Sequence, residues 1–209
     1  MENSKMAENN YVCLSGVISE ECVFSHEVYG EGFYIFKTEV KRLSETEDIL
    51  PVTVSERLID INSLKRGMTV NVMGQMRSYN HYSSKKNKLI LTTFAKEIEI
   101  GEDILANPNE IFLNGFICKT PVYRTTPFGR EITDLLIAVN RSYGKSDYIP
   151  CIAWGRNAKF AGGLEVGNNI EIWGRVQSRN YQKKLENDEI EERTAYEVSI
   201  SKIDLIDRR

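Results

Sequence analysis

The stretch GMTVNVMGQMRSYN (residues 67–80) decides the organisation of this 209-residue chain, because it returns in altered form as GNNIEIWGRVQSRN (residues 167–180). A second pair, LSGVI at 14–18 and LNGFI at 113–117, is separated by 99 residues, and the first pair by 100. A period this long indicates tandem domains, since the units of solenoid proteins are far shorter. The sequence therefore contains two copies of one fold.

The boundaries of the two copies follow from the repeat and from turn signals. We expect a disordered N-terminus at residues 1–10, a degenerate first copy at 11–100, a linker at 101–110 and a second copy at 111–209. The linker contains Asn-Pro-Asn at 107–109, which is typical of a turn. Each copy has enough residues to fold around its own core.

The composition is that of an ordinary globular protein, with 41% hydrophobic residues, 27% charged residues and a net charge of −3. No apolar run reaches the roughly 18 residues of a membrane span. The N-terminus, MENSKMAENN, is polar where a signal peptide would be basic and then apolar. We therefore expect a cytoplasmic protein without a membrane segment.

The residues that usually carry catalysis do not form a recognisable pattern. Four cysteines without a CxxC spacing and only two histidines do not fit a metal site, so we expect reduced thiols, no metal and no cofactor. No nucleophile stands beside a base, and no glycine-rich phosphate loop occurs. The sequence predicts a binding protein and not an enzyme.

Within the second copy the hydrophobic period is mostly two, as in β-strands. Five β-branched or aromatic runs lie at residues 111–118, 132–139, 148–154, 169–181 and 194–206. A short helix is expected at 157–164, between the third and fourth runs, and its counterpart in the first copy is 56–64. This order predicts an all-β protein of two tandem OB-folds, which are five-stranded Greek-key barrels.

Several segments of the second copy are also similar to a known family. They are LNGFI, PVYRTTPFGREI (121–132), LLIAVNRSY (135–143), DYIPCIAWGRNA (147–158), VGNNIEIWGRVQSRNY (166–181) and RTAYEVSI (193–200). In this order they resemble the DNA-binding domain of bacterial single-stranded DNA-binding proteins over nearly all of residues 111–206, and the first copy resembles it more faintly. The resemblance implies single-stranded DNA binding in replication, recombination or repair.

A protein that holds single strands of any sequence needs aromatic faces for the bases and cations for the phosphates. The resemblance implies that the stacking residues are Tyr143, Tyr148, Trp154 and Tyr181. The arginines interleaved with them, which we expect near phosphates, are Arg141, Arg156, Arg175 and Arg179. For each aromatic the alternative of a core or interface role stays open, as it does for Trp173, whereas Phe160 is expected in the core.

The first copy lacks most of these features. Where the second copy has its first three stacking residues, the first copy has Ser44, Ile49 and Ser55. Its basic hairpin at 77–88 contains His81 and Tyr82, which we expect to contact DNA unless the hairpin is only a solvated loop. The acidic run LSETEDI (43–49) would repel phosphates and is interpreted as a solvated face. We expect the first copy to serve mainly architecture.

Other functions stay open from the sequence alone. A protein-interaction module of the same fold, such as a primosome-like assembly component, would use the aromatics as an interface, and the negative net charge favours it. The interleaved arginines favour a phosphate backbone instead. RNA is a third candidate, because stacking does not distinguish ribose from deoxyribose.

Two expectations about partners come from the resemblance. Proteins similar to this one usually assemble four OB-folds, so we expect a homodimer in which two chains supply four. The family usually ends in a flexible linker with an acidic, Phe-terminated tip, whereas this sequence stops at IDLIDRR (203–209). Recruitment of replication enzymes through such a tail is therefore doubtful.

Overall fold

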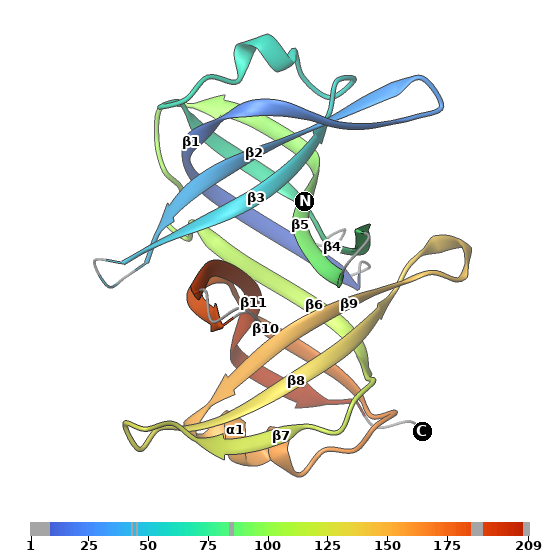
Figure 1. Cartoon of the computed structure of the whole chain (residues 1–209), viewed down its shortest axis with the longest axis vertical. Helices are drawn as coiled ribbons and strands as arrows, with labels where there is room; N and C mark the ends of the chain where they lie inside the picture. Colours follow the sequence, from blue (N-terminus) through green and yellow to red (C-terminus); the bar gives the residue numbers. More distant parts are fainter. Residues whose placement is uncertain (1–8, 43, 45, 84–85, 185–189, 207–209) are drawn as a thin grey trace.

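The computed structural model describes residues 9–42, 44, 46–83, 86–184 and 190–206, and shows two β-barrels arranged end to end (Figure 1). The first barrel consists of β1 (Asn10–Val28), β2 (Glu31–Lys41), β3 (Glu47–Ser55), β4 (Thr69–Ser83) and β5 (Lys86–Gly101). The second consists of β6 (Asn109–Ile117), β7 (Val122–Thr125), β8 (Glu131–Asn140), β9 (Ser146–Trp154), β10 (Asn169–Lys184) and β11 (Ile190–Leu205). Residues 1–8 of the expected disordered N-terminus lie outside the described residues, whereas Asn10 already belongs to β1.

Each barrel closes in the strand order of an OB-fold. In the first, β1 pairs with β2 and β4, β2 pairs with β3, and β3 runs parallel to β5. The second repeats this arrangement, with β6 beside β8 and β10 and with β9 parallel to β11. The short β7, which the sequence did not predict, extends the sheet beside β8. The predicted class of two tandem OB-folds is confirmed.

The repeated stretch that identifies the two copies also supplies equivalent parts of both cores. Successive side chains of a strand point to opposite faces. As a result Val70 and Val72 of β4 enter the first barrel, and Ile170 and Ile172 of β10 enter the second, all four with no exposed surface. β-branched side chains pack well on such half-buried strands.

The helix predicted at 157–164 is confirmed and begins two residues earlier, whereas the helix predicted at 56–64 does not form. The second barrel has α1 (Gly155–Gly162), which turns Ala158 and Ala161 inward, so that Phe160 is 44% exposed and not in the core as expected. In the first barrel the corresponding segment forms only the 3-10 turn η2 (Ile61–Ser63). The Asp60 side chain accepts a hydrogen bond from the Asn62 backbone, and such local bonds compete with helix formation.

The barrels are joined through an antiparallel pairing of β1 with β6. Tyr11 lies opposite Phe112, and Val12 lies opposite Ile111. Val12 and Ile111 are equivalent positions of the repeat, so this pairing has the form of a two-fold symmetric contact. A single 11-stranded sheet runs through both barrels as a result.

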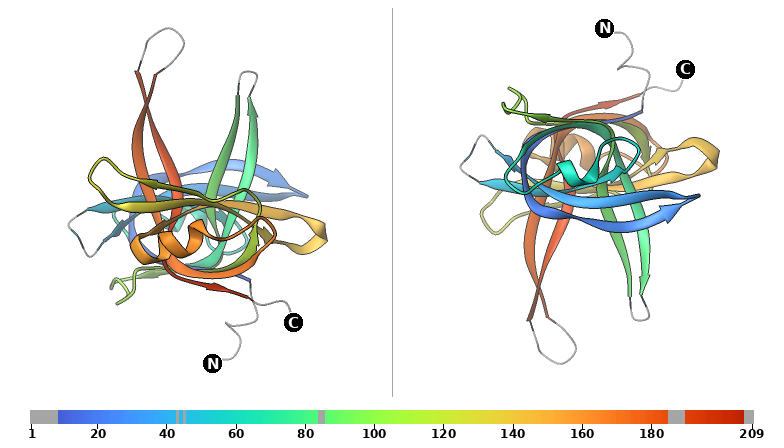
Figure 2. Two further views of the ribbon diagram at one scale, coloured as in Figure 1. Left: turned by 90° about the horizontal axis from the view of Figure 1, so that it is seen from below. Right: turned by 90° about the horizontal axis from the view of Figure 1, so that it is seen from above.

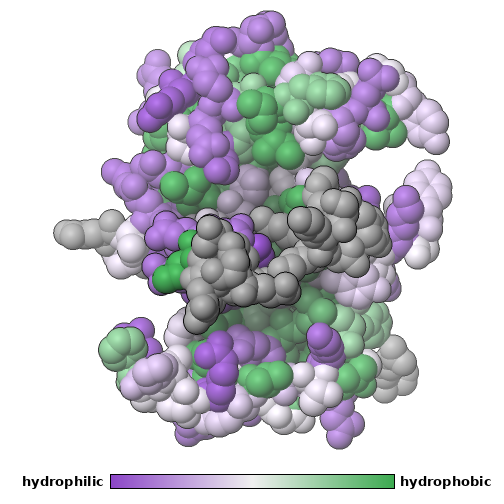
Figure 3. All heavy atoms as spheres, viewed as in Figure 1, coloured by the Kyte–Doolittle hydropathy of each residue, from purple (hydrophilic) through white to green (hydrophobic). Residues whose placement is uncertain are grey.

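The hairpins β4–β5 and β10–β11 extend from the same face of the molecule (Figure 2). Over the face shown in Figure 3, hydrophilic and hydrophobic side chains alternate without merging into one apolar surface. None of the helices among the described residues has the length and apolar character needed to cross a membrane.

Candidate nucleic-acid interface

The four aromatic residues proposed for stacking all lie on the surface of the second barrel. Tyr148 and Trp154 are both exposed and lie on the outward face of β9, where even-numbered positions point away from the core. Tyr181 is exposed on β10, in the part that projects as a hairpin. Tyr143 stands in the loop between β8 and β9 and is 98% exposed. None of the four is a core residue.

The loop that carries Tyr143 holds it in an unfavourable backbone conformation. Its φ is 62°, and the following Gly144 has a φ of 66°. The left-handed region costs a residue with a Cβ atom roughly 1–2 kcal/mol. Because its ring is almost fully exposed, packing of that ring does not offset the cost. Strain of this kind gathers at functional positions.

The equivalent positions of the first barrel do not form a stacking surface. Ile49 is exposed on β3, and Ser44 is an exposed loop residue. Ser55 is buried: its hydroxyl donates to Glu31 and accepts from the Arg57 backbone N–H at 3.1 Å. Ser55 therefore has a structural role beside the turn of the β1–β2 hairpin.

The outward rows of the two projecting hairpins carry related residues in different order. On β10 the row reads Arg175, Gln177, Arg179 and Tyr181, and the equivalent row of β4 reads Gln75, Arg77 and Tyr79. The Arg179 guanidinium lies over the Tyr181 ring, 5.8 Å from its centroid, which is a cation–π distance. The side chains of His81 and Tyr82, although on β4, are outside the described part, so their predicted contacts stay predictions.

A buried aspartate links the barrels on each side of the β1–β6 seam. Asp48 has no exposed surface, and its carboxylate accepts two hydrogen bonds from Arg42, at 2.6 and 2.7 Å. It also accepts one from the Ser178 backbone N–H of the other barrel at 2.7 Å. Arg175 approaches the same carboxylate at 3.4 Å. This corrects our interpretation of residues 43–49 as a solvated face, because Asp48 is buried in the contact between the two barrels.

Asp147 occupies the equivalent position on the other side. It is fully buried and accepts from the Ser78 backbone N–H at 2.7 Å and from Arg77 at 3.0 Å. Arg141 approaches it at 3.4 Å. The predicted phosphate ligands Arg141 and Arg175 are therefore each held loosely by a buried carboxylate, with further N–H donors left over on each guanidinium.

The remaining two predicted arginines are more exposed. Arg156 lies on the surface in the first turn of α1, directly after Trp154 and Gly155. The Arg179 side chain is 57% exposed, and its Nε atom lies 3.8 Å from Glu197. Both can reach a ligand that lies on the outer surface of the second barrel.

Sequence reasoning missed the tips of two equivalent hairpins. Tyr29, at the β1–β2 turn, is fully exposed with a φ of 51°, and Phe128, before β8, is 93% exposed. Each ring directly precedes a glycine, Gly30 or Gly129, at the same place in the repeat. Aligning the two copies through these hairpins would have revealed both aromatics.

Trp173 has a packing role on the surface of the second barrel. Its ring lies 5.1 Å from that of Phe112, and the Lys202 ammonium lies 4.1 Å from its centroid. Among the residues that the structure describes, no three His, Cys, Asp or Glu side chains come together as a metal site. None of the four cysteines forms a disulfide with another.

Comparison with known proteins gives a family for the second barrel. The model of the single-strand binding protein family matches residues 108–206. The single-stranded DNA-binding protein 1 of Staphylococcus aureus is 35% identical over 83 residues, which cover 36% of this chain and 50% of that protein. The chain thus spans about half the length of the curated relatives it matches.

Solved structures resemble the whole arrangement. The wild-type single-stranded DNA binding protein from Thermus aquaticus aligns over 96% of this chain and 94% of its own, at a TM-score of 0.74 and 19% identity. At that identity the likeness concerns the fold. The N-terminal domain of a PriB protein from Thermoanaerobacter tencongensis is 48% identical and covers 46% of this chain and 100% of its own, at a TM-score of 0.41.

Proposed function

The second barrel of this chain belongs to the single-strand binding protein family, and on that premise we propose that the chain binds single-stranded DNA without sequence preference. The binding residues are exposed aromatics that stack on bases and arginines that contact phosphates. The process served would be replication, recombination or repair of DNA. Catalysis is not part of the proposal.

One observation carries the proposal. Four aromatic side chains are exposed on one barrel, namely Tyr143, Tyr148, Trp154 and Tyr181, and the equivalent barrel of the same chain does without the first three. Aromatic rings at these three positions are not needed for the fold, because the first barrel closes without them. Arg156 and Arg179 stand beside two of these rings, as a phosphate backbone requires.

The first test is a titration with oligo-dT that follows tryptophan fluorescence at low and moderate salt, with duplex DNA of equal length as control. We expect quenching by the single strand only, with affinity falling as salt rises because phosphate contacts release counterions. An unquenched protein that binds no labelled oligo-dT would contradict the proposed function.

Variants of Trp154 make this test specific. Trp154→Ala should weaken binding by about 1–3 kcal/mol, the value of one stacked base. Trp154→Phe keeps a stacking face and should retain most of the affinity while losing the quenching, since Trp173 packs on Phe112 and Lys202. Equal affinity for Trp154→Ala and wild type, measured by anisotropy of a labelled oligonucleotide, would exclude stacking on this residue.

A protein partner for the first barrel is a second candidate function. The β1–β2 hairpin exposes Val23, Phe24, Val28 and Tyr29, and acidic residues flank them. Carboxylates repel a phosphate backbone, so this hairpin suits a protein surface better than DNA. Pull-down with purified replication proteins, comparing wild type with Phe24→Ser, tests this; equal retention of any bound partner would exclude the hairpin.

Homodimer formation is a separate proposal. Two chains would bring four OB-folds together, and β7 offers a strand that is paired on one side, with β8, within the described sheet. Such edges can pair with another chain. Sedimentation at working concentration should give twice the mass of 24.0 kDa, and a monomer mass would exclude the dimer.

A further inference from the structure

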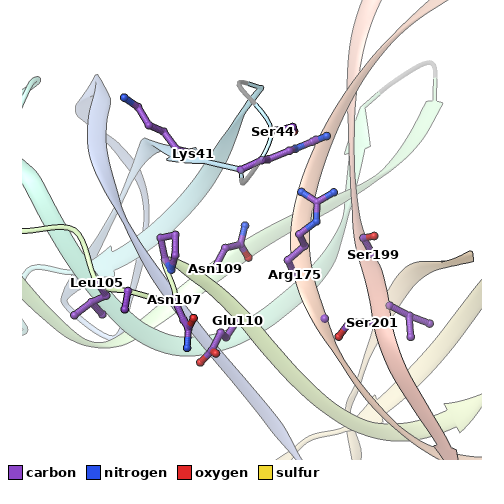
Figure 4. A pocket seen from close by; sticks show the side chains of 14 residues that line it. Lys41, Ser44, Leu105, Asn107, Asn109, Glu110, Arg175, Ser199 and Ser201 are labelled. Atoms are coloured by element: carbon purple, nitrogen blue, oxygen red, sulfur yellow. The ribbon is translucent and has the colours of Figure 1, made fainter.

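A pocket of about 710 Å³ with both apolar and charged lining residues lies between the barrels on the side of the Asp48 cluster (Figure 4). Its walls come from Lys41 and Arg42 at the end of β2, from residues 105–108 and the start of β6, and from β10 and β11 with Arg175 and Ser199. We call it the inter-barrel pocket. In Figure 4 the Arg175 side chain rises from β10 toward the loop that carries Ser44.

The charges in this pocket are unevenly matched. Arg42 binds the Asp48 carboxylate through two short hydrogen bonds, and Arg175 makes only a 3.4 Å contact with it. Burial and the neighbouring Arg42 charge lower the pKa of Arg175, and the Asp48 carboxylate opposes them. Glu110 adds a carboxylate on the linker wall. Lys41 at the rim faces Glu47 on β3, so Arg175 is the more available cation.

The position of the cross-barrel arginine differs between the two sides of the molecule. Under the repeat, Arg175 corresponds to Gln75 and Lys41 corresponds to Asn140, so the equivalent region on the other side of the molecule lacks both charges. The buried aspartate there is bound by Arg77, two positions further along its strand. Each buried aspartate is thus contacted by an arginine of the other barrel, and the pocket side differs in carrying that arginine at position 175 and a lysine at position 41.

The pocket is continuous with the outward row of β10. Residues at every second position of a strand share one face, so Arg175, Arg179 and Tyr181 form a line. The line begins at the inter-barrel pocket and ends on the projecting hairpin with a ring proposed to stack on a base. A strand held at Tyr181 has cations along a direct route into the pocket.

We propose that the inter-barrel pocket binds backbone phosphates of a single strand that passes from Tyr181 toward the first barrel, with Arg175 as the main ligand and Lys41 at the rim. This rests on the proposed single-strand binding. Under this proposal the single strand also contacts the first barrel, although that barrel lacks the stacking residues of the second.

The test compares Arg175→Gln, which installs the first barrel's own residue, with wild type on two lengths of oligo-dT. About 10 nucleotides approximates one OB-fold site, and about 30 nucleotides is long enough to cross between barrels. We expect about a tenfold loss on the long strand, with a slope of log affinity against log salt lower by about 0.7 for one lost phosphate contact. The loss on the short strand should be clearly smaller.

Three further variants guard the interpretation. Lys41→Asn should also weaken binding more on the long strand than on the short one, but by a smaller factor. It replaces Arg175→Gln in the test if that variant has a lower melting temperature than wild type. Arg175→Lys should recover part of the loss because it keeps a point charge. Lys65→Asn removes one charge from an exposed turn before β4, outside the pocket, and is the matched control.

The outcomes separate the two proposals. Wild-type binding with an equal loss on both lengths, or with no loss on the long strand, would overturn the pocket proposal and leave the proposed function standing. Failure of the wild type to bind either strand would overturn both. A loss confined to the long strand, absent in Lys65→Asn, supports the pocket.

Discussion

The two barrels share their cores and their seam but differ in what they expose. Buried aspartates occupy equivalent positions, Asp48 and Asp147, and both bind a serine backbone N–H of the opposite barrel. Outward positions such as 49 and 148 carry isoleucine in one barrel and tyrosine in the other. The difference teaches that the interface between barrels constrains both copies, whereas the outer surface records the separate function of each.

The largest expected effect concerns the seam, where the barrels are alike. Asp48→Ala leaves Arg42 and Arg175 without their shared carboxylate, and breaking a buried ion pair costs about 3–5 kcal/mol. We expect a loss of that size in the free energy of unfolding, measured by urea denaturation.

Asp147→Ala sharpens this comparison. Asp147 lacks the doubly bound arginine that Asp48 has in Arg42, so we expect a smaller loss. Asp48→Asn is the control that keeps an acceptor for the Ser178 N–H. If Asp147→Ala lowered the free energy of unfolding as much as Asp48→Ala or more, the expected difference between the two sides of the seam would be wrong.

The next effect concerns the surface, where the barrels differ. Tyr148→Ala should weaken oligo-dT binding by about 1–3 kcal/mol through lost stacking. Ile49→Ala, at the equivalent and similarly exposed position, should leave the affinity unchanged. Anisotropy titrations check both, and equal effects of the two variants would remove the functional distinction between the barrels.

A smaller effect is expected from adding an aromatic ring to the first barrel. Ile49→Tyr places a flat face at an exposed position of β3, where strands tolerate tyrosine well. We expect an affinity gain below the roughly 1–3 kcal/mol of a preorganised stacking site, seen only with long oligo-dT. No gain would mean that the strand does not pass over this face.

The smallest expected effect separates the two hairpin tips. The backbone of Tyr29 is left-handed, with a φ of 51°, whereas the backbone of Phe128 has no positive φ. Asparagine tolerates the left-handed region, so Tyr29→Asn should raise the free energy of unfolding by about 0.5 kcal/mol. Phe128→Asn should give no such gain. Thermal unfolding monitored by circular dichroism checks the pair, and equal shifts would show that backbone strain is not the cause.

The hydrophobic period of the strands and the internal repeat were enough to predict the two barrels, because both can be read directly from the sequence. The four aromatics were named from the family resemblance; the structure exposes all four, and their stacking on bases stays a prediction. The role of Asp48 could not be predicted from the sequence, because its partners Ser178 and Arg175 are distant along the chain. Nothing in LSETEDI distinguishes a buried carboxylate from a solvated one. The helix at 56–64 failed because Asp60 forms a local turn that propensity alone does not weigh.

The β1–β6 seam has a consequence for how such a molecule can change. In a homodimer with this symmetric pairing, every substitution appears on both halves at once, so a stacking residue cannot be lost from one half and kept in the other. Covalent linkage of the two copies through residues 101–110 removes that restriction. One chain can then carry a specialised half and a divergent half while the contact between them stays that of two equal partners.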